Sequence, residues 1–259
     1  MGTMLKLCLP TTRGAAYAAA LSLGMAATIS PAAFAQSAAK PKAMVELYTS
    51  QGCSSCPPAD AYLRKLANRD DLIALTFSVD YWDHIGWKDT LARPKNAKRQ
   101  YAYAKRKPGG DNRVYTPQMI VNGIACAVGS HEAKVEAEIA RTIALLADAR
   151  VALSARLDNG TIEIEAGAAT HEAHTSGSIW VAAVTKAIDV AIQRGENEGR
   201  KITYANVVRD FTTVASWSGT ADRYLVPLDK LEASDADFYV VVLQSSANGA
   251  VLAAVDVGR

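Results

Sequence analysis

The chain has 259 residues, of which 49% are hydrophobic, and its 28 Lys plus Arg against 26 Asp plus Glu give a formal net charge of +2. This composition is typical of a globular protein. A general nucleic-acid binder would carry a basic excess that this chain lacks.

The first 35 residues have the pattern of a secretory signal. Lys6 and Arg13 precede an apolar run over residues 14–29, and residues 33–35 match an A-x-A cleavage site. The run is too short and too rich in alanine for a membrane anchor, and no later run of about 18 apolar residues follows. We predict a cleaved signal peptide at residues 1–35, export to the periplasm, and no stable membrane insertion afterwards.

Cleavage would leave 26 basic and 26 acidic residues and three cysteines, Cys53, Cys56 and Cys126. In an oxidising compartment an odd number leaves at least one thiol outside any internal disulfide. Cys126 lies among alanines, so we expect a small buried apolar side chain there. The alternative is a third thiol that forms mixed disulfides.

Strands and helices alternate in the first part of the mature chain. Apolar runs of strand length alternate with segments of helical periodicity. Asn122-Gly123 favours a tight hairpin turn, and Ser130 can cap a helix whose apolar face includes Ile143. In chain order we predict a strand at 44–48, a helix at 59–67, a strand at 72–79, a basic solvated helix and loop within 87–113, a hairpin at 119–128 and a helix at 130–149.

After residue 150 the hydrophobic period changes from 3.6 to 2, which indicates strands without helices. Two Asn-Gly pairs supply turns between them. We therefore predict an α/β domain at 36–149, with a mixed sheet and helices on both faces, and an all-β sandwich-like domain at 150–259. The predicted strands are at 151–157, 162–166, 179–184, 190–193, 205–214, 224–226, 238–244 and 251–257.

The stretch TSQGCSSCPPAD, residues 49–60, places Cys53 and Cys56 between a strand and a helix. A C-x-x-C at a helix start can lower a thiol pKa through unpaired N–H groups and the helix dipole. We expect Cys53 to face solvent and attack, and Cys56 to resolve. Pro57 and Pro58 fit a first helical turn, so regular helix should begin at Pro57.

The neighbours of the pair refine this hypothesis. Ser54 and Ser55 can hydrogen-bond to sulfur, and Gly52 should leave the approach to Cys53 open. Asp60, in the first helical turn, would oppose a nearby thiolate. Two other interpretations remain open: two thiolates could hold copper(I), or the disulfide could be a structural staple.

Four motifs carry a resemblance to a known family. In chain order they are VELYTSQGCSSCPPAD, VDYWDHIGWKD, YTPQMIVNG and RGENEGRKITYANVVRD. The strand, C-x-x-C, helix and Thr116-Pro117 resemble the thioredoxin and glutaredoxin fold, and the whole set resembles the exported family catalogued as domain of unknown function 1223. The resemblance implies that Pro117 is a cis-proline facing the cysteines and that Thr116 shapes substrate selectivity.

The chain departs from thioredoxin in a long insertion, residues 81–112. We expect Trp82, Asp83 and Trp87 in this insertion to form part of the site wall or of an interface. Asp80 or Asp83 could accept a proton near the cysteines. The polar residues of the fourth motif, among them Glu196 and Asn197, are interpreted as a loop held by its own hydrogen bonds. The alternative is a contact with a partner or with the cysteine domain.

These observations predict a periplasmic or secreted thiol-disulfide oxidoreductase. Its substrate would be a protein or small-molecule disulfide or thiol, its redox partner a separate molecule, and it would need no cofactor or metal. The alternative is a non-catalytic binding protein, with the cysteines as a copper(I) clamp or structural disulfide and the β domain as the partner-binding surface.

Overall fold

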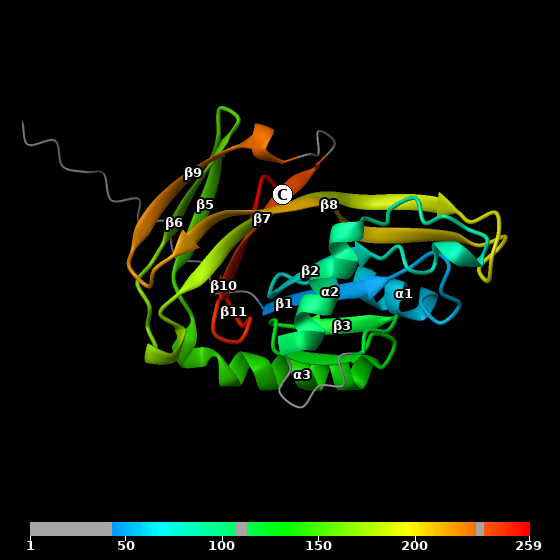
Figure 1. Ribbon diagram of the computed structural model, residues 1–259, viewed down its shortest axis with the longest axis horizontal. Coiled ribbons are helices and arrows are strands. Elements are labelled where there is room, and N and C mark those ends of the chain that lie inside the picture. Colours follow the sequence, from blue (N-terminus) through cyan, green and yellow to red (C-terminus); the bar gives the residue numbers. More distant parts are fainter. Residues whose placement is uncertain (1–42, 107–112, 232–235) are drawn as a thin grey trace, which may run out of the picture. The chain divides into compact units, whose positions relative to one another are not determined.

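The computed structural model describes residues 43–106, 113–231 and 236–259 (Figure 1). The predicted signal peptide at 1–35 lies outside the described residues, and so do residues 107–112 of the insertion. These described residues form one compact unit. No described helix is long and apolar enough to cross a membrane.

Four strands of the first half form a mixed sheet. β1 (Ala43–Thr49) runs parallel to β2 (Leu72–Ser78) and antiparallel to β3 (Gln118–Val121), which pairs with β4 (Ala125–Val128). Every residue of β1 and β2 is buried. Continuous apolar runs of this kind are typical of strands that are covered on both faces. The helices of this half are α1 (Pro57–Leu66), α2 (Pro94–Arg106) and α3 (Glu132–Leu145).

The hairpin between β3 and β4 is confirmed, because Asn122 and Gly123 have φ angles of 46° and 73°. The helix that follows differs from the prediction at both ends. Its N-cap is His131 rather than Ser130, and it stops at Leu145 before a short 3₁₀ turn at Ala147–Ala149. The buried face contains Thr142, whose hydroxyl accepts a hydrogen bond from Asn122 at 2.9 Å, while Ile143 is 41% exposed.

Most of the second half extends the same sheet. Its strands β7 (Gly177–Ala191), β8 (Lys201–Trp217), β10 (Phe238–Ser245) and β11 (Val251–Val257) complete the order β11-β10-β7-β8-β2-β1-β3-β4. A separate sheet contains β5 (Leu153–Asp158), β6 (Thr161–Ala166) and β9 (Asp222–Pro227). Apolar side chains of β6 and β9 share a core with those of β7, β10 and β11. The mixed sheet with helices and the additional β-rich region are thus present.

The two halves join between β2 and β8, where Thr76 pairs with Val207. Two side chains complete the junction: the Thr76 hydroxyl donates to the Ala205 carbonyl at 2.6 Å, and the Asn206 amide donates to the Ala74 carbonyl at 2.9 Å. Asn206 has a φ of 46°, in the left-handed region that Asn adopts more readily than most residues. The predicted boundary near residue 150 therefore does not coincide with a break in the main sheet.

The basic helix α2 is packed rather than simply solvated. Arg99 forms a buried ion pair with Glu46 of β1, at 2.6 Å between Nε and Oε2, and its guanidinium carbon lies 4.1 Å from the centre of the Trp180 ring. Lys95 forms an ion pair with the buried Asp210 of β8. These contacts fix α2 against β1 and β8.

Candidate functional site

Cys53 and Cys56 form a disulfide at the start of α1, with 5.4 Å between their Cα atoms. Regular helix begins at Pro57, as the two prolines indicated, and Cys56 is the N-cap. Both cysteines are 0% exposed. The expectation that Cys53 faces solvent is therefore wrong: neighbouring segments cover this disulfide.

The two serines between the cysteines are exposed. The Ser55 hydroxyl lies 3.4 Å from Cys53 Sγ, within hydrogen-bond distance for sulfur. The backbone N–H of Ser54 donates to the Glu196 carboxylate at 3.1 Å. The exposed part of this loop thus presents hydroxyl groups, while the sulfur atoms lie beneath it.

The insertion, residues 81–112, packs against the cysteine loop at Gly52. A Cβ on Gly52 would lie 3.2 Å from Trp82 Cβ and 3.3 Å from Ile85 Cδ1, so the open approach expected at Gly52 is closed. The Trp82 indole donates to the Thr116 hydroxyl at 2.8 Å. Trp82 therefore bridges the cysteine loop and the Thr116-Pro117 loop.

The peptide bond between Thr116 and Pro117 is cis. Pro117 is buried. A Cβ on Gly129 would touch Pro117 at 3.3 Å and Ala59 of α1 at 3.1 Å, so the proline lies near the first turn of α1. The structure thus brings Pro117, Thr116, Trp82 and the two cysteines into one region.

Gln51, two residues before Cys53, is anchored by three residues of the insertion. The Trp87 indole donates to the side-chain oxygen of Gln51 at 2.7 Å, and the backbone N–H of Gln51 donates to Asp89 Oδ2 at 2.8 Å. Thr90 accepts from its amide at 3.1 Å. Asp83 lies behind this contact, where its carboxylate accepts from the Asp89 N–H at 3.0 Å.

A hollow of about 740 Å³ opens beside this part of the insertion. Asp83 lies in the wall of this hollow, where its carboxylate accepts a hydrogen bond from Asp89. His84 is exposed and bonds the Tyr81 carbonyl. The lining residues are Asp80, Asp83, Lys88, Asp89, Thr90, Ala92, Arg93 and Pro94.

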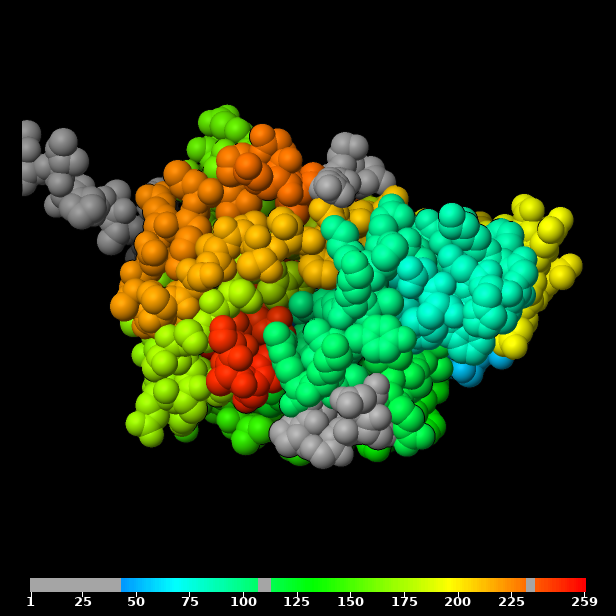
Figure 2. All heavy atoms as spheres, viewed as in Figure 1, coloured from blue at the N-terminus to red at the C-terminus, as the bar shows by residue number. Residues whose placement is uncertain are grey.

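The loop between β7 and β8 provides the second cover. The side-chain amide of Asn197, which is 1% exposed, donates to the carbonyls of Gln51 at 2.9 Å and Cys53 at 2.8 Å. A Cβ on Gly195 would lie 3.3 Å from Trp87 Cβ, so this loop also meets the insertion. Figure 2 shows the two segments adjoining on the surface, the insertion in cyan and the loop in yellow.

A buried polar group lies under the cysteine loop. Asp60 accepts a hydrogen bond from the Thr49 hydroxyl at 2.7 Å, and its other oxygen, Oδ2, has no partner among the described residues. Burial raises the pKa of the Asp60 carboxyl to about 8, against the lowering effect of Thr49 and with a further rise from Asp89. Asp60 is thus largely protonated at neutral pH, which removes the expected repulsion of a nearby thiolate.

Two further groups belong to this buried set. Burial raises the pKa of Asp89 to about 6, although the N–H groups of Gln51, Leu91 and Ala92 lower it. The Tyr204 hydroxyl of β8 is buried and has no hydrogen-bond partner among the described residues. Its pKa is raised by burial and by the charges of Asp60 and Asp89.

The remaining cysteine and a pair of histidines lie elsewhere. Cys126 is partly buried on β4, outside the disulfide. His171 and His174 have ring centres 5.9 Å apart, and His174 bonds the Ser245 hydroxyl. Within the described ranges, no group of three His, Cys, Asp or Glu side chains is arranged to hold a metal ion.

One of the two alternatives for the fourth motif, a contact of Glu196 and Asn197 with the cysteine domain, is confirmed. Asn197 lies 144 positions after Cys53. The only signal was its place in the fourth motif, between two glycines and among charged residues. The sequence analysis missed Asp89 and Tyr204, although they lie in the second and fourth motifs, because their relation to the cysteines depends on how β8 and the insertion pack.

Comparison with known proteins gives structures and a family that match most of the chain. A solved structure of protein AGR_C_4864 from Agrobacterium tumefaciens is 31% identical, with 85% of this chain and 95% of that chain covered and a TM-score of 0.73. HBP35 of Porphyromonas gingivalis is similar in fold at 10% identity, with coverage of 83% and 74% and a TM-score of 0.56. No curated protein matches. A family profile described as "Protein of unknown function (DUF1223)" matches residues 44–244, and the chain belongs to this family.

Proposed function

We propose that the protein is an exported, periplasmic thiol-disulfide oxidoreductase with a thioredoxin-like domain. The observation that carries the proposal is the position of the Cys53–Cys56 disulfide, at the start of a helix and near a cis-proline. The strand order β2-β1-β3-β4, with helices between and after the strands, supports the thioredoxin-like part. The predicted export signal supports the location.

The exchange would proceed in two steps that conserve electrons. In the reduced protein the Cys53 thiolate attacks a substrate disulfide, forming a mixed disulfide and releasing one substrate thiolate. The Cys56 thiolate then attacks Cys53 Sγ, which releases the second thiolate and forms the Cys53–Cys56 disulfide. Two electrons pass to the substrate, and a separate dithiol partner restores the protein. The reverse sequence oxidises a substrate dithiol.

Neighbouring residues have distinct parts in this proposal. Asp60, one helical turn after Cys56, is buried with its pKa raised to about 8, so the fraction of molecules in which it is ionised can accept the proton that the Cys56 thiol must lose. Ser55 can donate a hydrogen bond to a Cys53 thiolate. Ser54, Thr116, Trp82 and Asp83 would contact the substrate, with Thr116 and Pro117 holding its backbone.

Complete burial of both sulfurs favours one alternative, in which the disulfide is static and the protein binds a partner without chemistry. A copper(I) clamp is the other version of that alternative, because two reduced thiolates suit the soft ion. Copper(I) titration of the reduced protein distinguishes the clamp from the static disulfide: a clamp would hold one ion and require both cysteines.

Trapping of mixed disulfides tests the proposed function. In cells of the source organism, Cys56→Ser should accumulate covalent partners through Cys53, because the resolving thiol is missing. Cys53→Ser should trap none. The opposite pattern would reverse the two roles, and the absence of partners from both variants would contradict exchange chemistry.

A further inference from the structure

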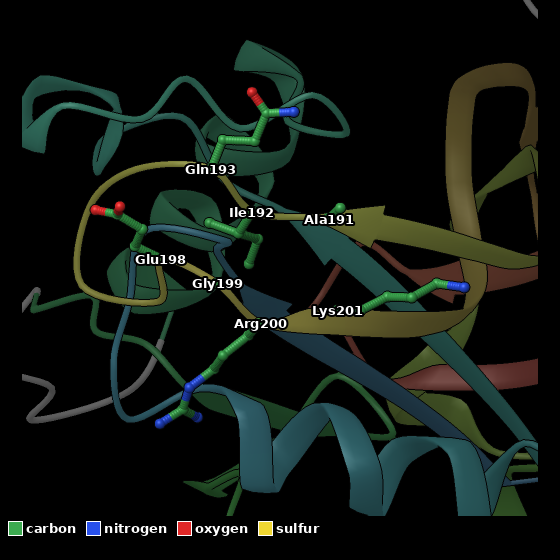
Figure 3. A pocket seen from close by; sticks show the side chains of 7 residues that line it. All are labelled: Ala191, Ile192, Gln193, Glu198, Gly199, Arg200 and Lys201. Atoms are coloured by element: carbon green, nitrogen blue, oxygen red, sulfur yellow. The ribbon is translucent and has the colours of Figure 1, made fainter.

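The covering loop between β7 and β8 has a simple construction. Its tip consists of residues 195–199, in which Gly195 and Gly199 have φ angles of 82° and 78° and enclose Glu196, Asn197 and Glu198. At its base, Ile192 exchanges backbone hydrogen bonds with Gly199 and Arg200. Figure 3 shows this base, where Ala191 and Ile192 leave β7 and Arg200 and Lys201 lead into β8.

We propose that residues 195–199 form a latch that must open before the disulfide can react, and that Asn197 and Glu196 are the positioning residues that hold it closed. This inference rests on the proposed exchange function and adds control of access to it. The same loop that belongs to the second half of the chain would thereby decide which substrates reach the cysteines.

The closed state follows from the contacts. Exchange requires a thiolate to reach a sulfur atom of the disulfide, and both cysteines are 0% exposed. The latch holds the cysteine loop through three hydrogen bonds: two from the Asn197 amide, to the carbonyls of Gln51 and Cys53, and one from Ser54 N–H to Glu196. These backbone groups are the ones that flank Cys53 in sequence.

The latch is held more weakly than the insertion, the other cover. The insertion is fixed by two indole hydrogen bonds, from Trp82 to Thr116 and from Trp87 to Gln51, by the Asp89 carboxylate, which accepts the Gln51 N–H, and by hydrogen bonds between Thr90 and the Gln51 side chain. Within the described residues, the hydrogen bonds from the latch to the cysteine loop involve two side chains, Asn197 and Glu196. Moreover, Asn197 Oδ1 is buried without a hydrogen-bond partner in the described structure, which lowers the stability of the closed state.

The glycines at the two ends of the tip allow it to move without disturbing the hairpin. Both occupy the left-handed region, which glycine adopts without the steric cost that other residues incur. A Cβ at Gly199 would meet no atom within 4 Å. Glu196 and Glu198 are exposed, so opening would transfer only Asn197 from a buried to an exposed position.

The test is the rate at which dithiothreitol reduces the Cys53–Cys56 disulfide in the full chain, measured by acid quench, alkylation and mass spectrometry of the peptide. Asn197→Ala should raise this rate about tenfold, because it removes two hydrogen bonds of ordinary strength. Glu196→Ala should raise it about threefold, and Glu196→Gln, which keeps an acceptor oxygen, should return it towards the original rate. Glu198→Gln is the matched control and should change nothing.

Hydrogen exchange of the Ser54 amide gives a second readout, because only Glu196 protects it among the contacts described here. Its exchange should accelerate in Asn197→Ala and Glu196→Ala while amides of β1 stay protected, which distinguishes latch opening from unfolding. If Asn197→Ala is poorly folded, Glu196→Ala, at an exposed position, provides the test.

Unchanged reduction rates in both alanine variants would overturn the latch, even with a reduction potential typical of exchange enzymes. Failure of the proposed function has a different signature. The reduction potential of the Cys53–Cys56 disulfide would then be that of a structural disulfide, whether or not the latch variants change the rate of its reduction.

Discussion

Two buried polar regions of the molecule differ in how completely their groups are paired. Around Glu46, both carboxylate oxygens are occupied: Arg99 and Tyr103 bind Oε1, and Arg99 and Tyr48 bind Oε2. Beneath the disulfide, Asp60 Oδ2 and Tyr204 OH, and in the covering loop Asn197 Oδ1, are buried without partners in the described structure.

The difference separates a structural role from a functional one. Buried polar groups in folded proteins are almost always hydrogen-bonded, so each exception needs an explanation. The Glu46 region ties α2 to β1 and stabilises the fold. The region beneath the disulfide carries unsatisfied groups at a cost in stability, as is common at sites where function sets the requirement.

The largest expected effect is in the paired region. Glu46→Gln leaves the Arg99 guanidinium, which is 11% exposed, without its counter-ion. Loss of one partner of a buried ion pair costs about 3–5 kcal/mol. We expect urea denaturation to show a decrease of this size in the free energy of unfolding.

The control is Glu132→Gln, in the exposed ion pair with Lys65, which should cost less than about 1 kcal/mol. Similar losses in the two variants would contradict the structural role assigned to the Glu46 region.

The second prediction concerns Asp60, whose pKa rises to about 8 on folding. From pH about 4 to about 8 the unfolded chain ionises this group while the folded protein keeps its proton, so stability falls as pH rises through that window and the loss is complete above it. Asp60→Asn keeps a neutral group of similar shape. It should increase the free energy of unfolding by about 2 kcal/mol or more at pH 8 and have little effect at pH 4.

Unfolding curves of this variant at several pH values check the prediction, with the exposed Asp70→Asn as the control. A gain at pH 4 equal to that at pH 8 would show that the Asp60 proton is not responsible.

The third prediction compares two buried tyrosines. The Tyr103 hydroxyl donates to Glu46 and accepts from Arg99 and Gln244, so Tyr103→Phe should cost about 2 kcal/mol. Tyr204 has an unpartnered hydroxyl, so Tyr204→Phe should be neutral or slightly stabilising, within about 0.5 kcal/mol. Thermal unfolding of both variants measures the difference, and equal costs would remove the distinction between the regions.

Local features of the sequence predicted much of the fold. The hairpin at Asn122-Gly123 and the helix start at Pro57 depend on residues with strong backbone preferences, and both are present. The predicted strands at 179–184 and 190–193 are instead parts of one strand, β7. The intervening Lys186 and Asp189 are exposed on it and interrupt the apolar pattern without ending the strand.

The pairing of β8 with β2 could not be predicted, because the contacting residues lie about 130 positions apart and a hydrophobic pattern does not specify a strand's partner. The same limit applies to the site. The cysteine motif indicated the disulfide, but its burial depends on Trp82 and Asn197, which reach it through tertiary packing.

The most direct test of the central claim is the reduction potential of the Cys53–Cys56 disulfide, measured in glutathione buffers of stepped potential with Cys126 replaced by serine. Thiol-disulfide exchange predicts a reversible value between about −120 and −270 mV. A disulfide that resists reduction below about −300 mV would be structural and would contradict the proposed function.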